Sequence, residues 1–292
     1  MVSIGGFKRL FWHVRCVIMA KSCSLEVGEG GSDMPVRLLS VFVAFLSMVG
    51  SICGQVPDAS AAAPPSDVGR QVRWRSLATN IASDQKQIWL FPTKVVRGRH
   101  IWPTLAVVAA TAALIATDAQ TAPHFRNTTA FSGFNSVFTS NATDMGVLTA
   151  PVLLYAAGWL VKDQYARHTA ILAGEAVADS EILTVIAKDI DRRRRPATYA
   201  PNTSMADNWF NGQGSWIRGN GSFPSGHAIA AFSVATVIAR RYPHQRWVPY
   251  VAYGLAGLVG FSRLTLTAHF PSDVFAGAAL GYSISRFAVL RQ

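Results

Sequence analysis

Three clusters of polar residues interrupt an otherwise apolar sequence, and each brings charged or nucleophilic side chains to the end of an apolar segment. The first is Lys188, six further residues, and Arg195-Pro196. The second is Pro224-Ser225-Gly226-His227, and the third is Ser262-Arg263, five residues, His269, three residues, and Asp273. Each cluster alone is weak evidence, so their meaning rests on all three occurring in this order.

The three cations are the first indication of an anionic ligand. Lys188, Arg195 and Arg263 suit an oxyanion that carries two or three negative oxygens. Ser225 leads directly into an apolar helix, so it can cap that helix while free amides point at an anion. Gly226 removes the side chain where the backbone must approach a ligand closely.

The two histidines add the chemistry. One nucleophile and one acid are the pair needed to displace an alcohol from phosphorus in two steps. Asp273 follows His269 by four residues, one helical turn on. That spacing predicts that Asp273 holds one imidazole nitrogen of His269 and leaves the other as an attacking lone pair.

The order and spacing of the clusters resemble the PAP2 superfamily, which includes lipid phosphate phosphatases, bacterial non-specific acid phosphatases and vanadium haloperoxidases. The family pattern is K-x6-RP, PSGH and SR-x5-H-x3-D, and residues 188–273 match it without a departure. In helix order the resemblance extends over about residues 100–290.

The resemblance implies a role for each matched residue. His269 would be the nucleophile that forms a phosphohistidine, and Asp273 would orient it. His227 would protonate the leaving oxygen and then activate water. The phosphate oxygens would be held by Lys188, Arg195, Arg263, Ser225 and the amide of Gly226. No metal or other cofactor is implied, because the cations already supply a metal's electrostatic stabilisation.

Composition favours a membrane protein with an anionic partner. Of 292 residues, 50% are hydrophobic and 15% are charged, against about 25% charged in soluble proteins. A formal net charge of +11 favours anionic lipid or phosphorylated substrates. No basic helical stripe or zinc-type spacing supports nucleic-acid binding. Cys16, Cys23 and Cys53 all precede residue 54, which excludes a disulfide or cysteine nucleophile in the main domain.

Hydropathy predicts an all-α fold of about six apolar helices embedded in a membrane, and the resemblance implies that they form a PAP2/haloperoxidase-like bundle. The segments are rich in Ala and Leu and show no period of two. They run over about 101–117, 145–161, 169–187, 227–239, 247–261 and 274–290. The first two are uncharged and at the short edge of what spans a bilayer. Residues 100–292 form the predicted phosphatase domain.

The N-terminal part reads as a leader over residues 1–61. Met34 begins an export signal with an apolar run over 35–54, and Ala59-Ser60-Ala61 offers a cleavage site. An uncleaved anchor is the alternative, and the true start is either Met1 or Met34. Residues 62–99 are predicted to be a linker followed by an interfacial helix over 76–92.

Basic connections predict the orientation. By the positive-inside rule, three of these connections are cytoplasmic. They lie before the first segment, between the second and third, and between the fourth and fifth. Loops 118–144, 188–226 and 262–273, which hold the site, then face the periplasm of a bacterial-type inner membrane. A cleaved signal would leave the chain outside before the first segment, whereas six spans in this orientation need it inside. Two further alternatives are therefore possible: some segments do not fully cross the membrane, or a periplasmic helical bundle rests on its surface.

Several charged residues receive a structural interpretation. Arg192, Arg193 and Arg194 are predicted to form a solvated or headgroup-facing surface. Acidic side chains within the third apolar segment are predicted to pair between helices or line a polar cavity. They are Glu175, Asp179 and Glu181.

The predicted function is a metal-independent phosphatase acting on lipid phosphate monoesters or diphosphates, such as phosphatidate or polyprenyl diphosphate. A periplasmic acid phosphatase of broad specificity is the closest alternative, and a haloperoxidase is a weaker one. A non-catalytic lipid-binding protein would lack His227 or His269, and both are present. The expected partners are a phosphorylated lipid and the membrane. The sequence does not determine the lipid head group, the oligomeric state, or whether the phosphate is transferred to water or to another acceptor.

Overall fold

A computed structural model describes residues 72–200, 203–210 and 221–291. The predicted leader, with its apolar run over 35–54 and its cleavage site, lies outside the described residues, as does most of the predicted linker. The described chain contains helices and no strand, which confirms the all-α prediction for this part of the protein.

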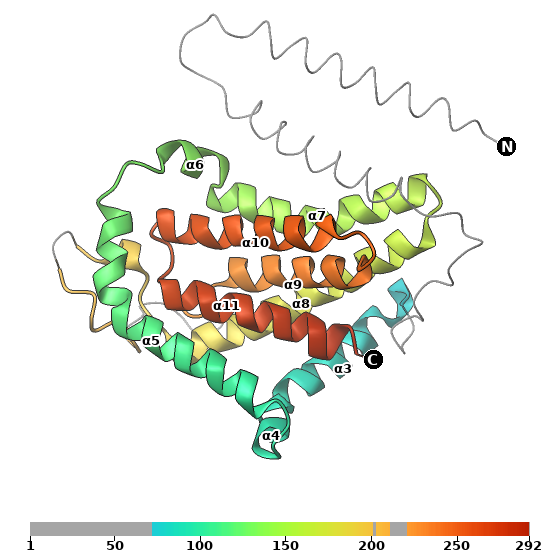
Figure 1. The fold of residues 1–292 in the computed structure, drawn as a ribbon, viewed down its shortest axis with the longest axis horizontal. Helices are drawn as coiled ribbons and strands as arrows, with labels where there is room; N and C mark the ends of the chain where they lie inside the picture. The colour runs from blue at the N-terminus through green and yellow to red at the C-terminus, as the bar shows by residue number, and fades with distance from the viewer. Residues whose placement is uncertain (1–71, 201–202, 211–220, 292) are drawn as a thin grey trace, which may run out of the picture. The chain divides into compact units, whose positions relative to one another are not determined.

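The helices follow one another with short connections (Figure 1). They are α3 (Leu77–Trp89), α4 (Phe91–Val96), α5 (Ile101–Arg126), α6 (Ser132–Val137), α7 (Ser140–Leu160), α8 (Gln164–Asp191), α9 (Gly226–Arg241), α10 (Trp247–Thr265) and α11 (Pro271–Ser283). Short helical turns are η1 (Trp74–Ser76), η2 (Pro196–Thr198) and the π-helix η3 (Ile284–Val289).

Each predicted apolar segment corresponds to one long helix: α5, α7, α8, α9, α10, and α11 continued by η3. Most of these helices extend beyond the apolar run, and polar side chains cap the N-termini of two of them, α7 and α8. The side chain of Thr139 accepts from the amide of Ala142 at the start of α7, and Asp163 accepts from Ala166 at the start of α8. Hydropathy does not detect such ends, and it also missed the short helix α6.

Helix α9 is the centre of the bundle. It packs against α8, α10 and α11, and Figure 1 shows α10, α9 and α11 running side by side. Five alanines lie on it, and most of its residues are buried. Because small side chains let neighbouring helices approach closely, one helix can be surrounded on several sides.

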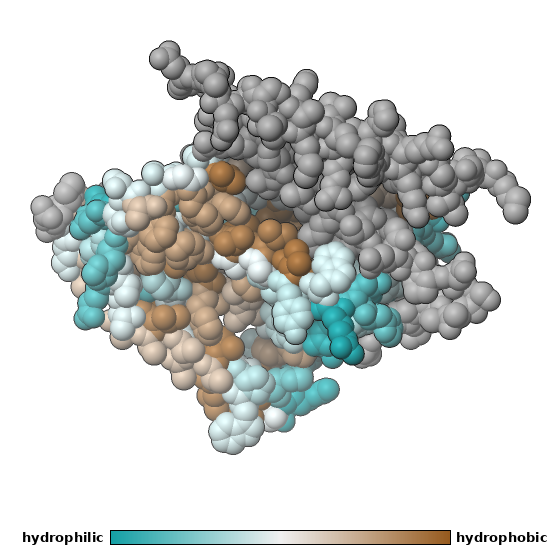
Figure 2. Space-filling view, turned by 45° about the horizontal axis from the view of Figure 1, so that its top comes forward, coloured by the Kyte–Doolittle hydropathy of each residue, from teal (hydrophilic) through white to brown (hydrophobic). Residues whose placement is uncertain are grey.

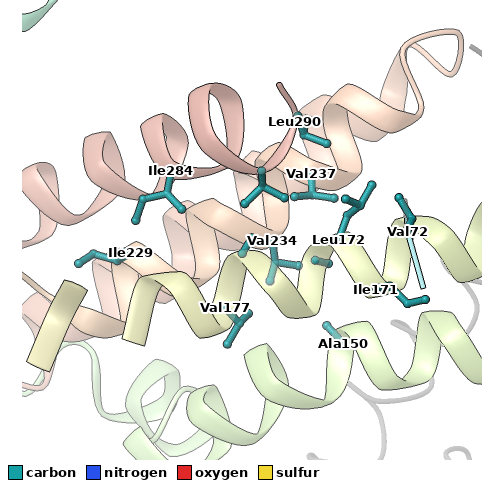
Figure 3. Packing of buried hydrophobic residues seen from close by; sticks show 13 residues of the cluster. Val72, Ala150, Ile171, Leu172, Val177, Ile229, Val234, Val237, Ile284 and Leu290 are labelled. Atoms are coloured by element: carbon teal, nitrogen blue, oxygen red, sulfur yellow. The ribbon is translucent and has the colours of Figure 1, made fainter. Parts of the chain in front are cut away.

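The largest apolar cluster lies where α8, α9 and η3 meet (Figure 3). Leu172 from α8, Val237 from α9 and Val289 from η3 are all completely buried. Ala150 contributes from α7. The core therefore joins the long helices to the C-terminal π-helix.

Helix α3 packs Leu77 and Ile88 against this core and is also attached through polar contacts. Asn80 donates to Glu175 at 2.8 Å, and Gln85 donates to Asp179 at 2.9 Å. Two of the three acidic residues of the third segment thus pair between helices, as predicted. Glu181, in contrast, is exposed.

Apolar side chains are also abundant on the outside. Large exposed ones include Trp102, Leu105 and Val108 on α5, Leu148 and Val152 on α7, and Leu255 and Leu258 on α10. Figure 2 shows a broad apolar area with hydrophilic residues at its edges. Among the described helices, only α5 is long and apolar enough to cross a membrane. By this criterion the other five segments do not qualify as spans.

Helices α9 and α11 touch backbone to backbone. A β-carbon on Gly281 would collide with the carbonyl oxygen of Ile229 and lie 3.0 Å from the amide nitrogen of Ser233, and one on Gly277 would lie 2.7 Å from the carbonyl oxygen of Ser225. These glycines let the two helices lie against each other. Their N-termini are further joined by the Ser225 amide, which donates to the Asp273 carbonyl at 3.0 Å.

We expect Gly281→Ala to destabilise the bundle, because the added methyl group forces α11 away from α9. Overpacking of this kind costs about 1–3 kcal/mol and lowers the thermal unfolding midpoint in detergent. Gly257→Ala is the matched control, since its β-carbon meets nothing within 4 Å and alanine is the better helix former by up to about 1 kcal/mol. Equal midpoints for the two variants would contradict the close packing of these helices.

Candidate active site

The predicted site residues gather at one end of the bundle, although they come from six different segments. Lys188 lies in the last turn of α8, and Ser225, Gly226 and His227 lie at the start of α9. Arg195 follows α8, Arg263 ends α10, His269 occupies the next turn, and Asp273 lies in the first turn of α11. The structure thus brings the residues predicted for one site to the same end of the bundle.

His269 is buried, and its main hydrogen-bond partner is a main-chain carbonyl. Its Nδ1 lies 2.7 Å from the carbonyl oxygen of Ser222. Because a carbonyl oxygen only accepts, Nδ1 carries the proton and Nε2 keeps its lone pair. Burial lowers the pKa of His269 to about 4, although the neighbouring Asp273 acts to raise it. The imidazole is therefore neutral above about pH 4, as a nucleophile must be.

Asp273 orients His269 less directly than its spacing predicted. His269 precedes α11, so the two residues are not one turn apart on a helix, and Nδ1 lies 3.6 Å from Oδ2 of Asp273. That oxygen instead accepts from the Ser222 hydroxyl at 2.6 Å and from the Phe270 amide at 2.8 Å. Asp273 thus holds the two segments on either side of the imidazole, and Ser222 is a site residue that sequence reasoning missed.

The prediction for Arg193 was wrong. Its side chain is fully buried rather than solvated, and it bridges two buried carboxylates. Nη1 lies 2.6 Å from Oδ1 of Asp273, and Nη2 lies 2.7 Å from Oδ2 of Asp118. Nε donates to the Asn208 side chain at 2.9 Å. A buried charge requires such pairing, because desolvation otherwise costs several kcal/mol.

Asp118 extends this network to α5. Besides Arg193, it accepts from the amide of Ser272 at 3.1 Å and from the Ser272 hydroxyl. The contact joins α5 to the first turn of α11, beside Asp273. A lone carboxylate inside an apolar helix was the available signal, since ionisable residues there are usually paired and functional. Nothing in the sequence distinguishes Arg193 from the adjacent arginines.

Lys188 and the start of α9 face the same space. A β-carbon on Gly226 would lie 3.0 Å from a methyl group of Thr184 and 3.6 Å from the ammonium nitrogen of Lys188. The glycine therefore lets the start of α9 pack closely on Thr184, and the ammonium lies within contact distance of the helix N-terminus. A cation and the free amides of a helix N-terminus both attract anions.

Ser225 occupies the N-cap position of α9, but its side chain makes no capping hydrogen bond. Its hydroxyl oxygen is completely buried and has no partner among the described residues. Buried hydroxyl groups without a partner are uncommon, and one beside a helix N-terminus and a lysine is consistent with a group that binds a ligand.

The two arginines of the site differ in how they are held. Arg263 is buried and donates to the Ser140 hydroxyl at 3.1 Å and to the Phe138 carbonyl at 2.9 Å, so it ties α10 to the turn before α7. The guanidinium of Arg195 has no hydrogen-bond partner in the described part of the chain. Burial lowers the pKa of Arg195, and the charge of Asp273 opposes this. Arg195 is thus the arginine with donors left for a ligand.

His227 contacts a carboxylate that sequence reasoning did not single out. Its Nε2 lies 2.8 Å from Oδ1 of Asp144, near the start of α7.

A separate hollow lies at the opposite ends of α7 and α8, lined by Trp159, Leu160, Lys162 and Arg167. It shares no residue with the site.

The site therefore combines a neutral buried imidazole, a second histidine, and three cations with a helix N-terminus. The charges of Lys188 and Arg195 act on His269. Such an arrangement can bind a tetrahedral oxyanion and stabilise the extra charge that develops when a nucleophile attacks its central atom.

We expect Arg193→Met to destabilise the fold by about 3–5 kcal/mol, because it leaves Asp118 and Asp273 as buried carboxylates without a cation. Thermal unfolding in detergent measures this loss. Arg194→Met is the matched control, since Arg194 is only partly buried and stacks on Tyr199. Adding Asp118→Asn to Arg193→Met removes one of the two unpaired charges and should recover part of the loss. Similar midpoints for the Arg193 and Arg194 variants would show that the buried pairs do not stabilise the fold.

Comparison with known proteins agrees with the motifs. Residues 169–292 match the family model of the PAP2 superfamily. The lipid A 1-phosphatase of Porphyromonas gingivalis is 39% identical over 61 residues, which cover 20% of this chain and 14% of that protein. The phosphatidylglycerophosphatase B of Bacillus subtilis is 43% identical over 68 residues, covering 20% and 34%.

Two further proteins are similar over longer stretches. The bacitracin transport permease protein BcrC of Bacillus licheniformis is 32% identical over 128 residues, covering 42% of this chain and 55% of that protein. This chain thus spans between 14% and 55% of the length of these relatives. A crystal structure of a transmembrane PAP2 type phosphatidylglycerolphosphate phosphatase from Bacillus subtilis aligns over 86% of this chain and 94% of its own, with 18% identity and a TM-score of 0.39.

The family match begins within α8 and continues to the C-terminus, so it includes all three motifs and every residue predicted for the site. Residues 169–292 of this chain belong to the PAP2 superfamily.

Proposed function

We propose that this protein is a membrane-bound phosphatase that hydrolyses lipid phosphate monoesters or diphosphates through a phosphohistidine on His269. The observation that carries the proposal is the state of this residue. A buried, neutral imidazole whose Nδ1 is bound to the Ser222 carbonyl presents one lone pair, and the charges of Lys188 and Arg195 act on it.

In the first step the substrate's phosphoryl oxygens bind Lys188, Arg195 and the free amides of α9, with the Ser225 hydroxyl as a further donor. Nε2 of His269 attacks phosphorus and forms an N–P bond as the P–O bond to the leaving alcohol breaks. His227 gives its proton to the leaving oxygen, so that a neutral alcohol departs.

The second step reverses the use of His227. It takes a proton from water, whose oxygen attacks the phosphorus, and the N–P bond breaks to release inorganic phosphate and neutral His269. The positive charge that His269 carries in the intermediate lies near Asp273, whose carboxylate is itself held by Arg193. Opposite charges at this range favour the charged form of the imidazole.

Membrane attachment is supported by the exposed apolar surface of α5, α7 and α10, because soluble monomers rarely expose such areas. Two relatives are named as phosphatases of lipid A and of phosphatidylglycerophosphate, which supports a lipid phosphate as substrate. The charge of the connecting loops supports a site that faces the periplasm of a bacterial inner membrane.

A periplasmic acid phosphatase of broad specificity is the second candidate. It is favoured by the finding that only one described helix is long and apolar enough to span a bilayer. The two candidates differ in solubility. Recovery of active, monodisperse protein from the periplasm without detergent would support the soluble enzyme and contradict the membrane-bound one.

We expect His269→Ala to abolish phosphate release from phosphatidate, because positioning by the cations cannot replace the attacking atom. Acid quenching of the wild type with labelled substrate should trap a phosphoryl adduct that is labile to acid and stable to base. His244→Ala, an exposed histidine between α9 and α10, is the control and should keep full activity. Phosphate release within tenfold of wild type by the His269 variant would exclude this nucleophile.

We expect the effect of His227→Ala to depend on the leaving group. An alkyl alcohol leaves poorly without a proton, whereas an activated aryl alcohol needs little protonation. The variant should therefore lose about 10²–10⁴ in kcat on an alkyl phosphate and far less on a nitrophenyl phosphate. His269→Ala should impair both substrates alike. Equal losses of the His227 variant on both substrates would show that His227 only binds phosphate or supports its helix.

A further inference from the structure

Among the described residues, Asp144 is the carboxylate in direct contact with His227, and it belongs to none of the three motifs. It lies on α7, and its Oδ1 is 2.8 Å from Nε2 of His227. That nitrogen makes no hydrogen bond of normal geometry within the described chain. The two side chains are therefore within ion-pairing distance, and Asp144 is the group that contacts this imidazole nitrogen.

Stability does not explain this contact. The Asp144 side chain is 56% exposed, and ion pairs that reach solvent contribute little to folding. Nor does Asp144 cap its helix, because the Thr139 side chain already accepts from the first turn of α7. A contact that the fold does not need, made to one of the two histidines of the site, points to the reaction.

A second carboxylate lies in the surroundings of His227. Glu181 is exposed on α8, and the charges of Lys188, Asp144 and His227 act on it. Lys188 and Arg263 also act on Asp144. His227 is therefore close to an acidic pair, Asp144 and Glu181, as well as to the cations that would hold the phosphoryl group.

The position of the acidic pair bears on the leaving group. In the proposed reaction His227 protonates the oxygen that departs, so the atoms attached to that oxygen must lie next to His227. In a monoester the neighbouring atom is an uncharged carbon. In a diphosphate it is a second phosphorus that carries negative oxygens, and the departing group is an anion. Two like charges a few ångströms apart near a protein surface repel strongly enough to change a rate by more than tenfold.

We propose, on the basis of the function proposed above, that Asp144 is a specificity-determining residue. It positions His227 for proton donation and, together with Glu181, places negative charge where the leaving group departs. The enzyme then accepts phosphate monoesters of uncharged alcohols and disfavours diphosphates, whose leaving group is itself an anionic phosphate ester. This narrows the substrate class to lipid phosphate monoesters.

The test compares hexyl phosphate with hexyl diphosphate, by initial phosphate release from the purified full-length chain in detergent. Wild type should prefer the monoester by at least tenfold in kcat/KM. Asp144→Asn removes the charge at nearly unchanged volume and should reduce this preference at least tenfold. Both consequences of the change act in the same direction, because weaker positioning of His227 slows the monoester and lost repulsion favours the diphosphate.

Asp163→Asn is the matched control. It also removes one carboxylate charge, but at the N-terminus of α8, the end far from Lys188. Asparagine is as good an N-cap residue as aspartate, so the substrate preference should stay at the wild-type value. Glu181→Gln provides a second variant of the acidic pair and should shift the preference in the same direction by a smaller factor. A thermal midpoint near wild type shows that each variant is folded.

Three results would overturn the inference. A wild type that prefers the diphosphate contradicts it while leaving the proposed phosphatase function in place. A preference that stays within threefold of wild type in both Asp144→Asn and Glu181→Gln also contradicts it alone, as does an equal shift in Asp163→Asn. A wild type that releases phosphate from neither substrate contradicts the proposed function and, with it, the role of Asp144.

Discussion

The buried guanidinium of Arg193 between Asp118 and Asp273 is the interaction on which the site end of the bundle depends. Three charges without access to water persist only because every one is paired and hydrogen-bonded. The pairing joins α5, the loop after α8 and the first turn of α11, which also share an apolar cluster of Ala122, Tyr199, Met205 and Phe270. Removing the cation would leave two buried carboxylates without a partner. The arrangement of these three segments therefore depends on the guanidinium.

A chain of three contacts connects this ion pair to the imidazole of His269. Arg193 holds one oxygen of Asp273, and the other oxygen binds the Ser222 hydroxyl and the amide that follows His269. The Ser222 carbonyl then selects the tautomer of His269. The imidazole thus owes its position to main-chain geometry, and its neutrality to burial. A carboxylate acting through a serine can stabilise a charged intermediate without clamping the ring in the ground state.

The rest of the fold brings cations together against their mutual repulsion. Lys188, Arg195 and Arg263 come from three segments, and α9 presents its N-terminus among them. Close packing of α11 on α9 through Gly277 and Gly281 sets where those amides lie. A bound oxyanion relieves the repulsion, so affinity for phosphate is a consequence of how the helices pack. The proposed role of Asp144 and Glu181 is to limit this attraction near His227.

The sequence by itself determined the helical class, the approximate helix positions and the motif residues, because hydropathy runs and short fixed spacings are local properties. It predicted one shared site for eight residues, and they do gather at one end of the bundle. Only the tertiary structure decided which polar residues are partners. A run of four arginines looks solvated until folding brings Asp118, 75 residues away, to Arg193. Ser222, 47 residues from His269, and Asp144, on another helix from His227, have no local signal. The reason is physical: burial and pairing are set by which helix ends meet, and that depends on the packing of the whole bundle.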